Sequence, residues 1–331
     1  MSINGRPSAQ LRIALIGAGS MGSLHARVLF QSRRCDLVRI VDPVPETGKA
    51  VADRWGVDWT PEVDLSGVDA VVVASATETH HALALEIIDA GLPLLVEKPV
   101  CADMPATEEV IGAAERRGVP IMCGFVERYN PAVLTAFALI GEPVHVTAAR
   151  HSPYAPRVRT GVAWDLLVHD VDLAVRCFGG AEPQRVSSGV GFFHPESVPG
   201  AEDVVETVLG FSTGGLATVS ASRIGQRKVR ELTIAEVDRS VEVDLLRRAV
   251  TIYRHVSGDA ADADGRGYRQ QTIIEIPELV TAAEPLASQL DRFLDLAAGK
   301  SDADAERDSI LPAHRVVADV LAESAEGALT G

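Results

Sequence analysis

The sequence LRIALIGAGSMG, residues 11–22, contains the pattern from which the fold of the chain can be predicted. It begins with a short apolar run typical of a buried strand, and residues 23–30 (SLHARVLF) then place apolar side chains at helical spacing. Between them lies G-x-G-x-x-G, in which Gly17 allows a tight turn, Gly19 lets a pyrophosphate approach the backbone, and Gly22 lets helix and strand pack closely. Because the helix N-terminus also offers free N–H groups to phosphates, the stretch predicts a dinucleotide-binding site.

Asp42 ends the next apolar run, Asp36–Asp42, at the distance from Gly22 where dinucleotide-binding domains carry an acidic residue. Its carboxylate would accept hydrogen bonds from both ribose hydroxyls of the cofactor, and it would repel a 2′-phosphate. Pro43 and Val44, which follow, offer no cation for such a phosphate. The sequence therefore predicts NAD as the cofactor. The alternative is that Asp42 only caps the turn at the end of the strand.

Apolar runs and helical patterns alternate from this stretch to about residue 126. Continuous apolar strands separated by helices indicate a parallel sheet covered on both faces. The fold class is therefore α/β, with a doubly wound Rossmann domain over residues 11–128 behind a short disordered lead at residues 1–10. The expected strands are Leu11–Gly17, Asp36–Asp42, Asp69–Ser75, Pro93–Lys98 and Pro120–Val126, and the helices after the first are Glu46–Trp55, Glu78–Ala90 and Ala106–Arg117.

Residues 129–331 have a different pattern. Helices are expected at Pro131–Ile140 and from about Val162 to Phe178, with a strand at Val144–Arg150. Alternating strands with short connections then run from Arg185 to Arg254, which indicates an open, mainly antiparallel sheet in an α+β domain. Residues 257–267 are expected to form a surface loop, and the helices Pro285–Ala298 and Leu311–Ala325 to close this second domain.

Composition excludes several classes of protein. The formal net charge of −15 disfavours nucleic acid and anionic membranes as partners. The four cysteines (Cys35, Cys101, Cys123 and Cys177) lie far apart, which argues against a disulfide framework or a zinc site, so no metal is expected. No stretch resembles a signal peptide or a membrane span. We therefore expect a cytoplasmic protein that acts on small molecules.

Two segments carry candidate catalytic residues. Lys98 ends an apolar strand just before Pro99, and the carboxyl ends of parallel strands are where ligands bind, although most lysines are merely solvated. In a helix, Asp165 and His169 would share one polar stripe with Asp172 and Arg176. A histidine held by carboxylates suits general acid–base catalysis. One alternative is a structural polar network. Another is a zinc site, but the sequence offers no further His/Cys pair to complete it.

A local excess of positive charge lies between these features. Arg150, His151, Arg157 and Arg159 fall within ten residues that contain no acid. Arginine side chains suit phosphate oxygens, so we expect Arg150, Arg157 and Arg159 to bind the phosphate of a sugar phosphate or sugar nucleotide. The alternative is an exposed loop whose arginines pair with surface acids.

The motifs in combination resemble the glucose–fructose oxidoreductase/inositol dehydrogenase (Gfo/Idh/MocA) family. They are GAGSMG (17–22), VEKP (96–99), GFVERYNP (124–131) and DLLVHDVD (165–172). Within the family, residues 127–133, 150–159 and 228–234 are most similar to UDP-N-acetylglucosamine 3-dehydrogenase-like members. The resemblance implies an oligomer, a homodimer or homotetramer, formed through the second-domain sheet. It implies that Lys98, Asp165 and His169 are catalytic and that Asp165 and His169 also contact the substrate. The residues that it implies as cofactor contacts are Gly17, Gly19, Ser20, Met21, Gly22, Asp42, Ser75, Thr77, His80, Glu97, Lys98 and Arg128.

These expectations together describe an NAD-dependent dehydrogenase or ketoreductase for a secondary alcohol of a sugar-type substrate. In the expected mechanism, His169 takes the alcohol proton, Lys98 stabilises the developing alkoxide, and Asp165 orients His169. The alternatives are an inositol or free-sugar dehydrogenase of the same fold, an enzyme that keeps its NAD bound through a redox cycle, and a non-catalytic dinucleotide-binding regulator.

Overall fold

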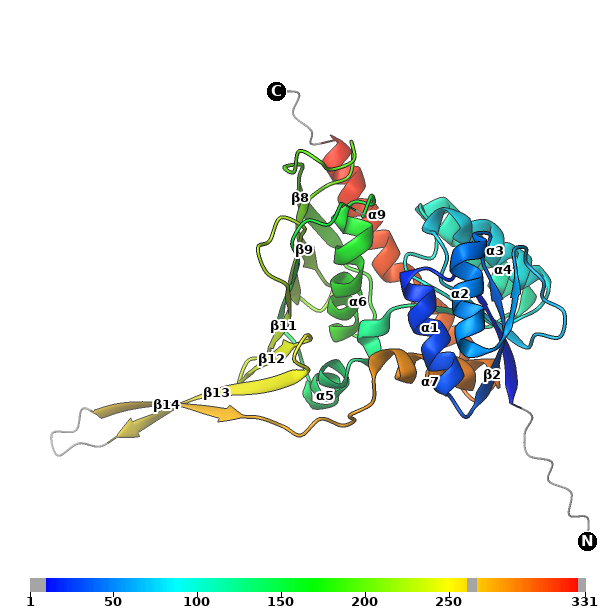
Figure 1. The fold of residues 1–331 in the computed structure, drawn as a ribbon. Helices are drawn as coiled ribbons and strands as arrows, with labels where there is room; N and C mark the ends of the chain where they lie inside the picture. Colours follow the sequence, from blue (N-terminus) through cyan, green and yellow to red (C-terminus); the bar gives the residue numbers. More distant parts are fainter. Residues whose placement is uncertain (1–9, 157, 261–266, 327–331) are drawn as a thin grey trace, which may run out of the picture. The chain divides into compact units, whose positions relative to one another are not determined.

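The computed structural model describes residues 10–156, 158–260 and 267–326 and divides them into two units (Figure 1). The first unit holds the described residues up to Val126 together with Pro285–Leu311, and the second holds Glu127–Glu284 and the described residues from Pro312 onward. The prediction had placed all of residues 129–331 in the second domain, so it was wrong for Pro285–Leu311.

The return of the chain to the first unit has a clear physical cause. Helix α7 (Pro285–Ala297) buries one apolar face, including Leu290 and Phe293, and packs against α1 (Ser20–Gln31). The Arg34 guanidinium, beyond the end of α1, donates hydrogen bonds to the carboxylates of Asp291 (3.0 Å) and Asp295. These contacts join segments more than 250 residues apart, which a reading of local patterns does not detect.

The first unit is built on a six-stranded parallel sheet in the order β3-β2-β1-β4-β5-β6. All five expected strands are present, and β1, β4, β5 and β6 are buried almost throughout. The strands are β1 (Leu11–Ile16), β2 (Cys35–Val41), β3 (Asp58–Thr60), β4 (Ala70–Val73), β5 (Leu94–Val96) and β6 (Ile121–Cys123); the remaining helices are α2 (Pro45–Trp55), α3 (Thr77–Asp89), α4 (Met104–Arg117) and α8 (Ala303–Asp308).

The strand order reverses between β1 and β4. From β1 the chain adds β2 and β3 on one side, then crosses to build β4, β5 and β6 on the other. The loops after β1 and β4 therefore leave the sheet in opposite directions, and ligands of doubly wound sheets bind at the carboxyl ends of the strands at such a point. The Gly-rich turn follows β1 here, as the sequence predicts.

The second unit holds an eight-stranded sheet in the order β14-β13-β12-β11-β7-β10-β9-β8. Among the described strands of this sheet, only β7 and β10 are parallel neighbours, so the sheet is mainly antiparallel and the predicted fold class is confirmed. The strands are β7 (His145–His151), β8 (Arg185–Gly191), β9 (Val204–Gly210), β10 (Leu216–Ser222), β11 (Val229–Ala235), β12 (Ser240–Asp244), β13 (Ala249–Ala260) and β14 (Gly267–Glu275).

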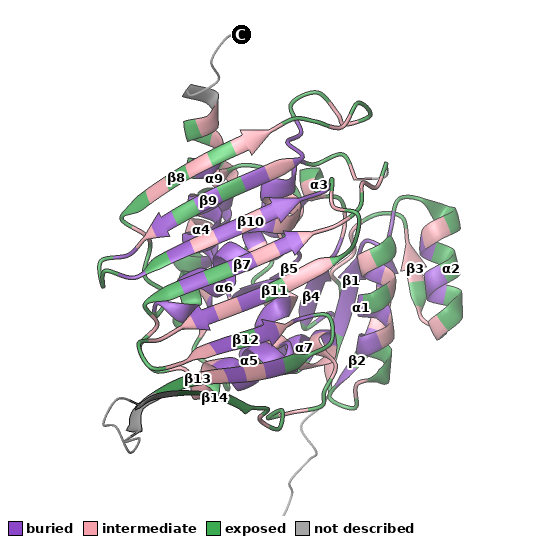
Figure 2. Cartoon of the chain, turned by 90° about the vertical axis from the view of Figure 1, so that its left-hand side faces the viewer, coloured by how far each residue is buried: buried purple, intermediate pink, exposed green. Residues whose placement is uncertain are grey.

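The two faces of this sheet differ in burial. Helix α6 (Val168–Cys177) packs on β7 and β10, and α5 (Pro131–Leu139) packs on β12 and β13. Figure 2 shows buried residues alternating with exposed or intermediate ones along the strands, as expected for a sheet covered on one face only. The last helix, α9 (Leu311–Glu326), contacts β8 through hydrogen bonds between Ser188 and Glu323.

Two local features differ from the prediction. The segment expected to be a loop, residues 257–267, instead contributes to β13 and β14, which pair as far as Ala260 and Gly267 (Figure 1). Residues 261–266 lie outside the described ranges. The expected helix at Val162–Phe178 begins with a π-helical turn, Ala163–Leu167, before α6 starts. Among the described residues, none of the helices has the length and apolar character needed to cross a membrane.

Candidate functional site

The Gly-rich turn after β1 has room for a ligand at one position and none at two others. Gly17 has φ +96°, and a Cβ there would lie 2.6 Å from the Ala74 carbonyl carbon. A Cβ on Gly22 would collide with the Gly17 carbonyl oxygen. A Cβ on Gly19 would meet no described atom within 4 Å, so this backbone faces open space. This geometry is compatible with the three separate roles predicted for the glycines.

The N-terminus of α1 is suited to a phosphate group. Within the described chain, no side chain caps the helix at Gly19, and no acid lies in its first turn. Ser20, Met21 and Gly22 form that turn, so their backbone N–H groups belong to the end of the helix that attracts anions. Neither a carboxylate nor a capping hydroxyl competes there with a bound pyrophosphate.

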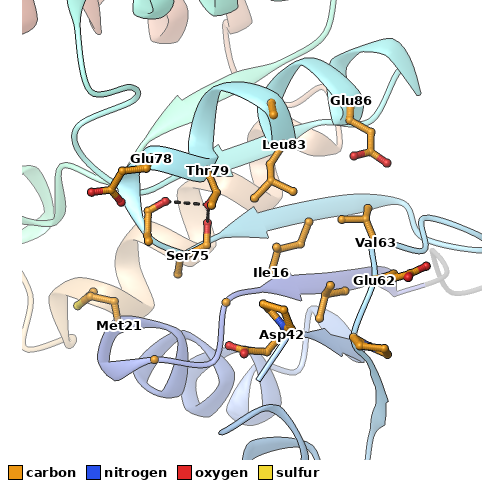
Figure 3. Close-up of a pocket in the computed structure, with 18 of the residues that line it drawn as sticks. Ile16, Met21, Asp42, Glu62, Val63, Ser75, Glu78, Thr79, Leu83 and Glu86 are labelled. Carbon is orange, nitrogen blue, oxygen red and sulfur yellow. Dashed lines mark hydrogen bonds between the residues drawn. The ribbon is translucent and has the colours of Figure 1, made fainter. Parts of the chain in front are cut away.

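A cavity of about 1060 Å³ opens beside this turn, at the switch point between β1 and β4 (Figure 3). Its walls are mainly apolar, and its charged residues are all acidic: Asp42, Glu62, Glu78 and Glu86. Among the described lining residues there is no lysine or arginine. Gly17, Gly19, Ser20, Met21, Asp42 and Ser75, all predicted cofactor contacts, line it, as do Ile16, Val41, Pro43, Pro61, Val63, Ala74, Ala76, Thr79, Ala82 and Leu83.

The Asp42 carboxylate connects the end of β2 to the Gly-rich turn. Its Oδ2 accepts a hydrogen bond from the Ala18 N–H (2.7 Å), and its Oδ1 accepts one from the Val44 N–H (2.9 Å). The bond to Val44 is the turn cap considered as the alternative role. A carboxylate can accept about four hydrogen bonds, so these two leave capacity for ribose hydroxyls. Asp42 can therefore cap the turn and bind a cofactor at once, and the acidic lining favours NAD over NADP.

Replacing Asp42 by alanine is expected to raise the Kd of NAD about tenfold and to narrow the preference over NADP. The change removes a charged acceptor for the ribose and the repulsion of a 2′-phosphate. Calorimetric titration with both cofactors measures both effects, with Glu86→Gln as a control that removes another acid of the same cavity. A wild-type protein that binds NADP more tightly than NAD would contradict the assignment.

Lys98 follows β5 and is half-buried, next to a buried acid. The Glu97 carboxylate bonds His25 of α1, with Nε2 and Oε1 2.7 Å apart, and its Oε2 accepts a long hydrogen bond from the Lys98 N–H (3.3 Å). A Cβ on Gly124 would lie 2.7 Å from the Glu97 Cδ, so any larger residue there would displace this carboxylate. Neither Glu97 nor Lys98, both predicted cofactor contacts, lines the cavity, and His25 is buried beside Glu97.

His80 connects the loops that follow β4 and β5. It is buried, with Nδ1 3.0 Å from the Pro99 carbonyl oxygen and Nε2 3.3 Å from that of Ser75. The Ser75 hydroxyl bonds that of Thr79 (2.7 Å; Figure 3). Thr77 begins α3 and, like His80, does not line the cavity.

The sequence prediction missed one wall of the cavity, which α3 provides. Thr79, Ala82, Leu83 and Glu86 recur at the i, i+3, i+4, i+7 spacing of one helix face. This spacing, on the helix that follows β4, is the feature of the sequence from which the wall could have been predicted.

Asp165 and His169 lie in the second unit, and both are half-buried. Asp165 belongs to the π turn and His169 to the first turn of α6. The expected polar stripe is not uniform, because Asp172 is buried whereas Arg176 is exposed. Asp172 instead binds Arg128, whose Nε and Nη2 donate to its two oxygens at 2.8 and 2.5 Å. The structure thus places Arg128, a predicted cofactor contact, in a buried ion pair of the second unit.

Arg150 is also buried, and carboxylates of its own unit bind its guanidinium. Its Nε and Nη2 donate to the two oxygens of Asp170 (2.7 and 2.9 Å), and its Nη1 donates to Glu127 (3.1 Å). Burial alone would lower the pKa of Arg150, but the two carboxylates raise it above the ordinary value. We therefore correct the predicted phosphate contact: Arg150 is part of a structural ion-pair cluster. Arg157 lies outside the described residues, and Arg159 is exposed.

No group of three or more His, Cys, Asp or Glu side chains in the described ranges could hold a metal ion. Lys98, Asp165 and His169 remain the predicted catalytic residues.

Comparisons with known proteins also indicate an oxidoreductase with an NAD-binding domain. A model of an oxidoreductase family with an NAD-binding Rossmann fold matches residues 11–125, and a GFO/IDH/MocA C-terminal domain model matches residues 137–242. UDP-N-acetylglucosamine 3-dehydrogenase of Acidithiobacillus ferrooxidans is 29% identical over 87% of this chain and 89% of its own. A solved structure of a UDP-N-acetylglucosamine 3-dehydrogenase from Acidithiobacillus ferrooxidans is 28% identical, with a TM-score of 0.79 over 95% of this chain and 98% of its own. A myo-inositol dehydrogenase of Streptomyces leeuwenhoekii is 31% identical over 64% of this chain and 70% of its own.

Proposed function

Because the chain belongs to the Gfo/Idh/MocA oxidoreductase family, we propose that it is an NAD-dependent dehydrogenase that oxidises a secondary alcohol of a sugar nucleotide, or reduces the corresponding ketone. The observation that carries the proposal is the cavity at the switch point, where the Gly19 backbone faces open space and the Asp42 carboxylate has capacity for further hydrogen bonds. The glycines, the uncapped end of α1 and the acidic lining all fit NAD.

The mechanism assigns each of three side chains one task. NAD, when bound, supplies the acceptor for the hydride. Lys98 donates a hydrogen bond to the alcohol oxygen and stabilises the negative charge that develops on it, an effect worth about 3 kcal/mol. His169 accepts the hydroxyl proton, and Asp165 orients His169 and stabilises its protonated form.

The choice of a sugar nucleotide rests on two points. One relative that spans nearly the whole chain is a UDP-N-acetylglucosamine 3-dehydrogenase. Arg159 is exposed on the loop after β7, so its guanidinium is accessible to a phosphate group. The initial test is a panel of UDP-N-acetylglucosamine, N-acetylglucosamine 1-phosphate, N-acetylglucosamine and myo-inositol, monitored by NADH absorbance.

Replacing Arg159 by alanine is expected to raise the KM for the phosphorylated members of that panel severalfold. Activity on free N-acetylglucosamine should change little, because that sugar has no phosphate to bind. The matched control is Arg185→Ala, which removes an exposed arginine at the start of β8. Equal turnover of free and phosphorylated sugars by the wild-type protein would mean that the loop after β7 does not bind the phosphate of the substrate.

Inositol is the second candidate substrate, because inositol dehydrogenases are prominent among the relatives. Oxidation of myo-inositol with a higher kcat/KM than any sugar in the panel would favour it. Binding of NAD without turnover of any panel member would instead favour a regulatory protein.

We further propose that the chain forms a homodimer or homotetramer through the uncovered face of the eight-stranded sheet. Val208 and Leu216 are exposed on β9 and β10, in strands whose alternate residues are buried (Figure 2). Large exposed apolar side chains within a sheet suit a contact with another surface. Light scattering on the purified protein measures the oligomeric state.

A further inference from the structure

Arg230 of β11 lies directly opposite Arg150 of β7 in the antiparallel register. Directly paired residues point to the same face of a sheet, so both arginines extend toward the face that α6 covers. Their environments differ: the Arg150 side chain is 3% exposed, whereas that of Arg230 is 40% exposed. The cluster thus has one arginine inside the unit and one at its surface.

The hydrogen bonds of the two guanidinium groups differ as well. Glu127 Oε1 accepts from the Nη1 of both, at 3.1 Å from Arg150 and 3.3 Å from Arg230. Arg150 also donates through Nε and Nη2 to Asp170. In the part of the chain that the structure describes, Nε and Nη2 of Arg230 have no acceptor. Since a guanidinium carries five N–H donors, most of those on Arg230 are available to a ligand.

The charges around Arg230 limit which ligand it can bind. Burial and the charge of Arg150 lower the pKa of Arg230, and the charges of Glu127, Asp170 and Asp165 oppose that shift. The cluster also adjoins the proposed catalytic histidine, because Asp170, the partner of Arg150, directly follows His169 in α6. The three carboxylates outnumber the two arginines. A phosphate would add negative charge to this excess, whereas an uncharged oxygen would not.

We propose that Arg230 binds an uncharged oxygen of the substrate, a ring hydroxyl or an amide carbonyl, next to the carbon that is oxidised. This assignment rests on the proposed function, because it takes His169, the neighbour of Asp170 in α6, to mark the reacting end of the substrate. It makes Arg230 a specificity-determining residue: a substrate without an oxygen at that position leaves a half-buried guanidinium with unused donors.

The first test replaces Arg230 by methionine, which keeps much of the side-chain volume and removes every donor. With UDP-N-acetylglucosamine, kcat/KM is expected to fall about 10- to 100-fold, the range for one hydrogen bond to a charged group. Arg230→Lys should recover part of the loss. The control is Arg247→Met, because that side chain is 85% exposed and, among the described residues, bonds only the nearby Asp244. Thermal unfolding establishes that each variant is folded.

The second test separates binding from a merely structural role. The wild-type protein is assayed with two analogues of UDP-N-acetylglucosamine, one without the 4-hydroxyl and one without the 2-acetamido group. One of these analogues should lower kcat/KM about as much as Arg230→Met does with the complete substrate. With that analogue, the kcat/KM of the Arg230→Met variant should be little lower than with the complete substrate, because the contact is already absent. Free UDP, as a competitive inhibitor, should have the same Ki for the variant and the wild type. A raised Ki would mean that Arg230 binds phosphate and would overturn the uncharged-oxygen assignment.

The outcomes also separate this inference from the proposed function. If the wild-type protein oxidises UDP-N-acetylglucosamine or myo-inositol and a folded Arg230→Met variant retains full kcat/KM, only the role of Arg230 is refuted. If the wild-type protein oxidises neither probe, the proposed function fails, and the assignment of Arg230 fails with it.

Discussion

Replacing Lys98 by methionine is expected to lower kcat by two or more orders of magnitude while the Kd of NAD changes little. Methionine has a similar length but cannot donate a hydrogen bond to the developing alkoxide. Two orders of magnitude correspond to about 2.7 kcal/mol of transition-state stabilisation. Lys98 does not line the cavity of the first unit, so cofactor binding should survive. Steady-state kinetics and NAD titration measure the two effects.

His169→Asn is the companion of that variant. It should lower kcat as strongly and remove one ionisation from the pH dependence of kcat/KM, because asparagine cannot accept the proton. Lys300→Met, at an exposed position, is the control for loss of a lysine. Near-normal turnover by either the Lys98 or the His169 variant would refute its catalytic role.

Arg150→Met is expected to lower the free energy of unfolding of the second unit by about 3–5 kcal/mol. The variant leaves Asp170 and Glu127 buried without their main cation, and removing one partner of a buried ion pair costs about that much. Urea unfolding, with fluorescence and circular dichroism compared for signs of separate transitions, measures the loss.

A double variant separates packing from charge. Arg150→Met with Asp170→Leu removes most of the unpaired charge and should recover part of the lost stability. If Arg150→Met were as stable as the wild type but had a raised KM for phosphorylated sugars, the original phosphate prediction would be correct and the structural role wrong.

Much of the first unit could be predicted because its information is local. Five apolar runs specify the buried parallel strands, and the glycine pattern with Asp42 specifies the switch-point site. Strand β3 was missed because it has only three residues, none of them buried. The π turn before α6 was missed because Ala163–Leu167 has the same apolar pattern as an ordinary helix.

The errors concern side chains whose partners lie far away in the sequence. Arg150 was assigned to phosphate because its neighbours include no acid, yet its carboxylate partners lie 20 and 23 residues away. Charge counted in a short window therefore cannot distinguish a buried ion-pair cluster from a site for an anion.

The central claim is that the chain catalyses hydride transfer from a sugar alcohol to NAD. The most direct measurement uses UDP-N-acetylglucosamine deuterated at C3, NAD and the purified protein, with mass spectrometry of the nicotinamide product. We predict one deuterium per molecule of NADH formed, and none with Lys98→Met over the same time. Bound NAD with no label transferred from this sugar or from myo-inositol deuterated at C2 would contradict the account.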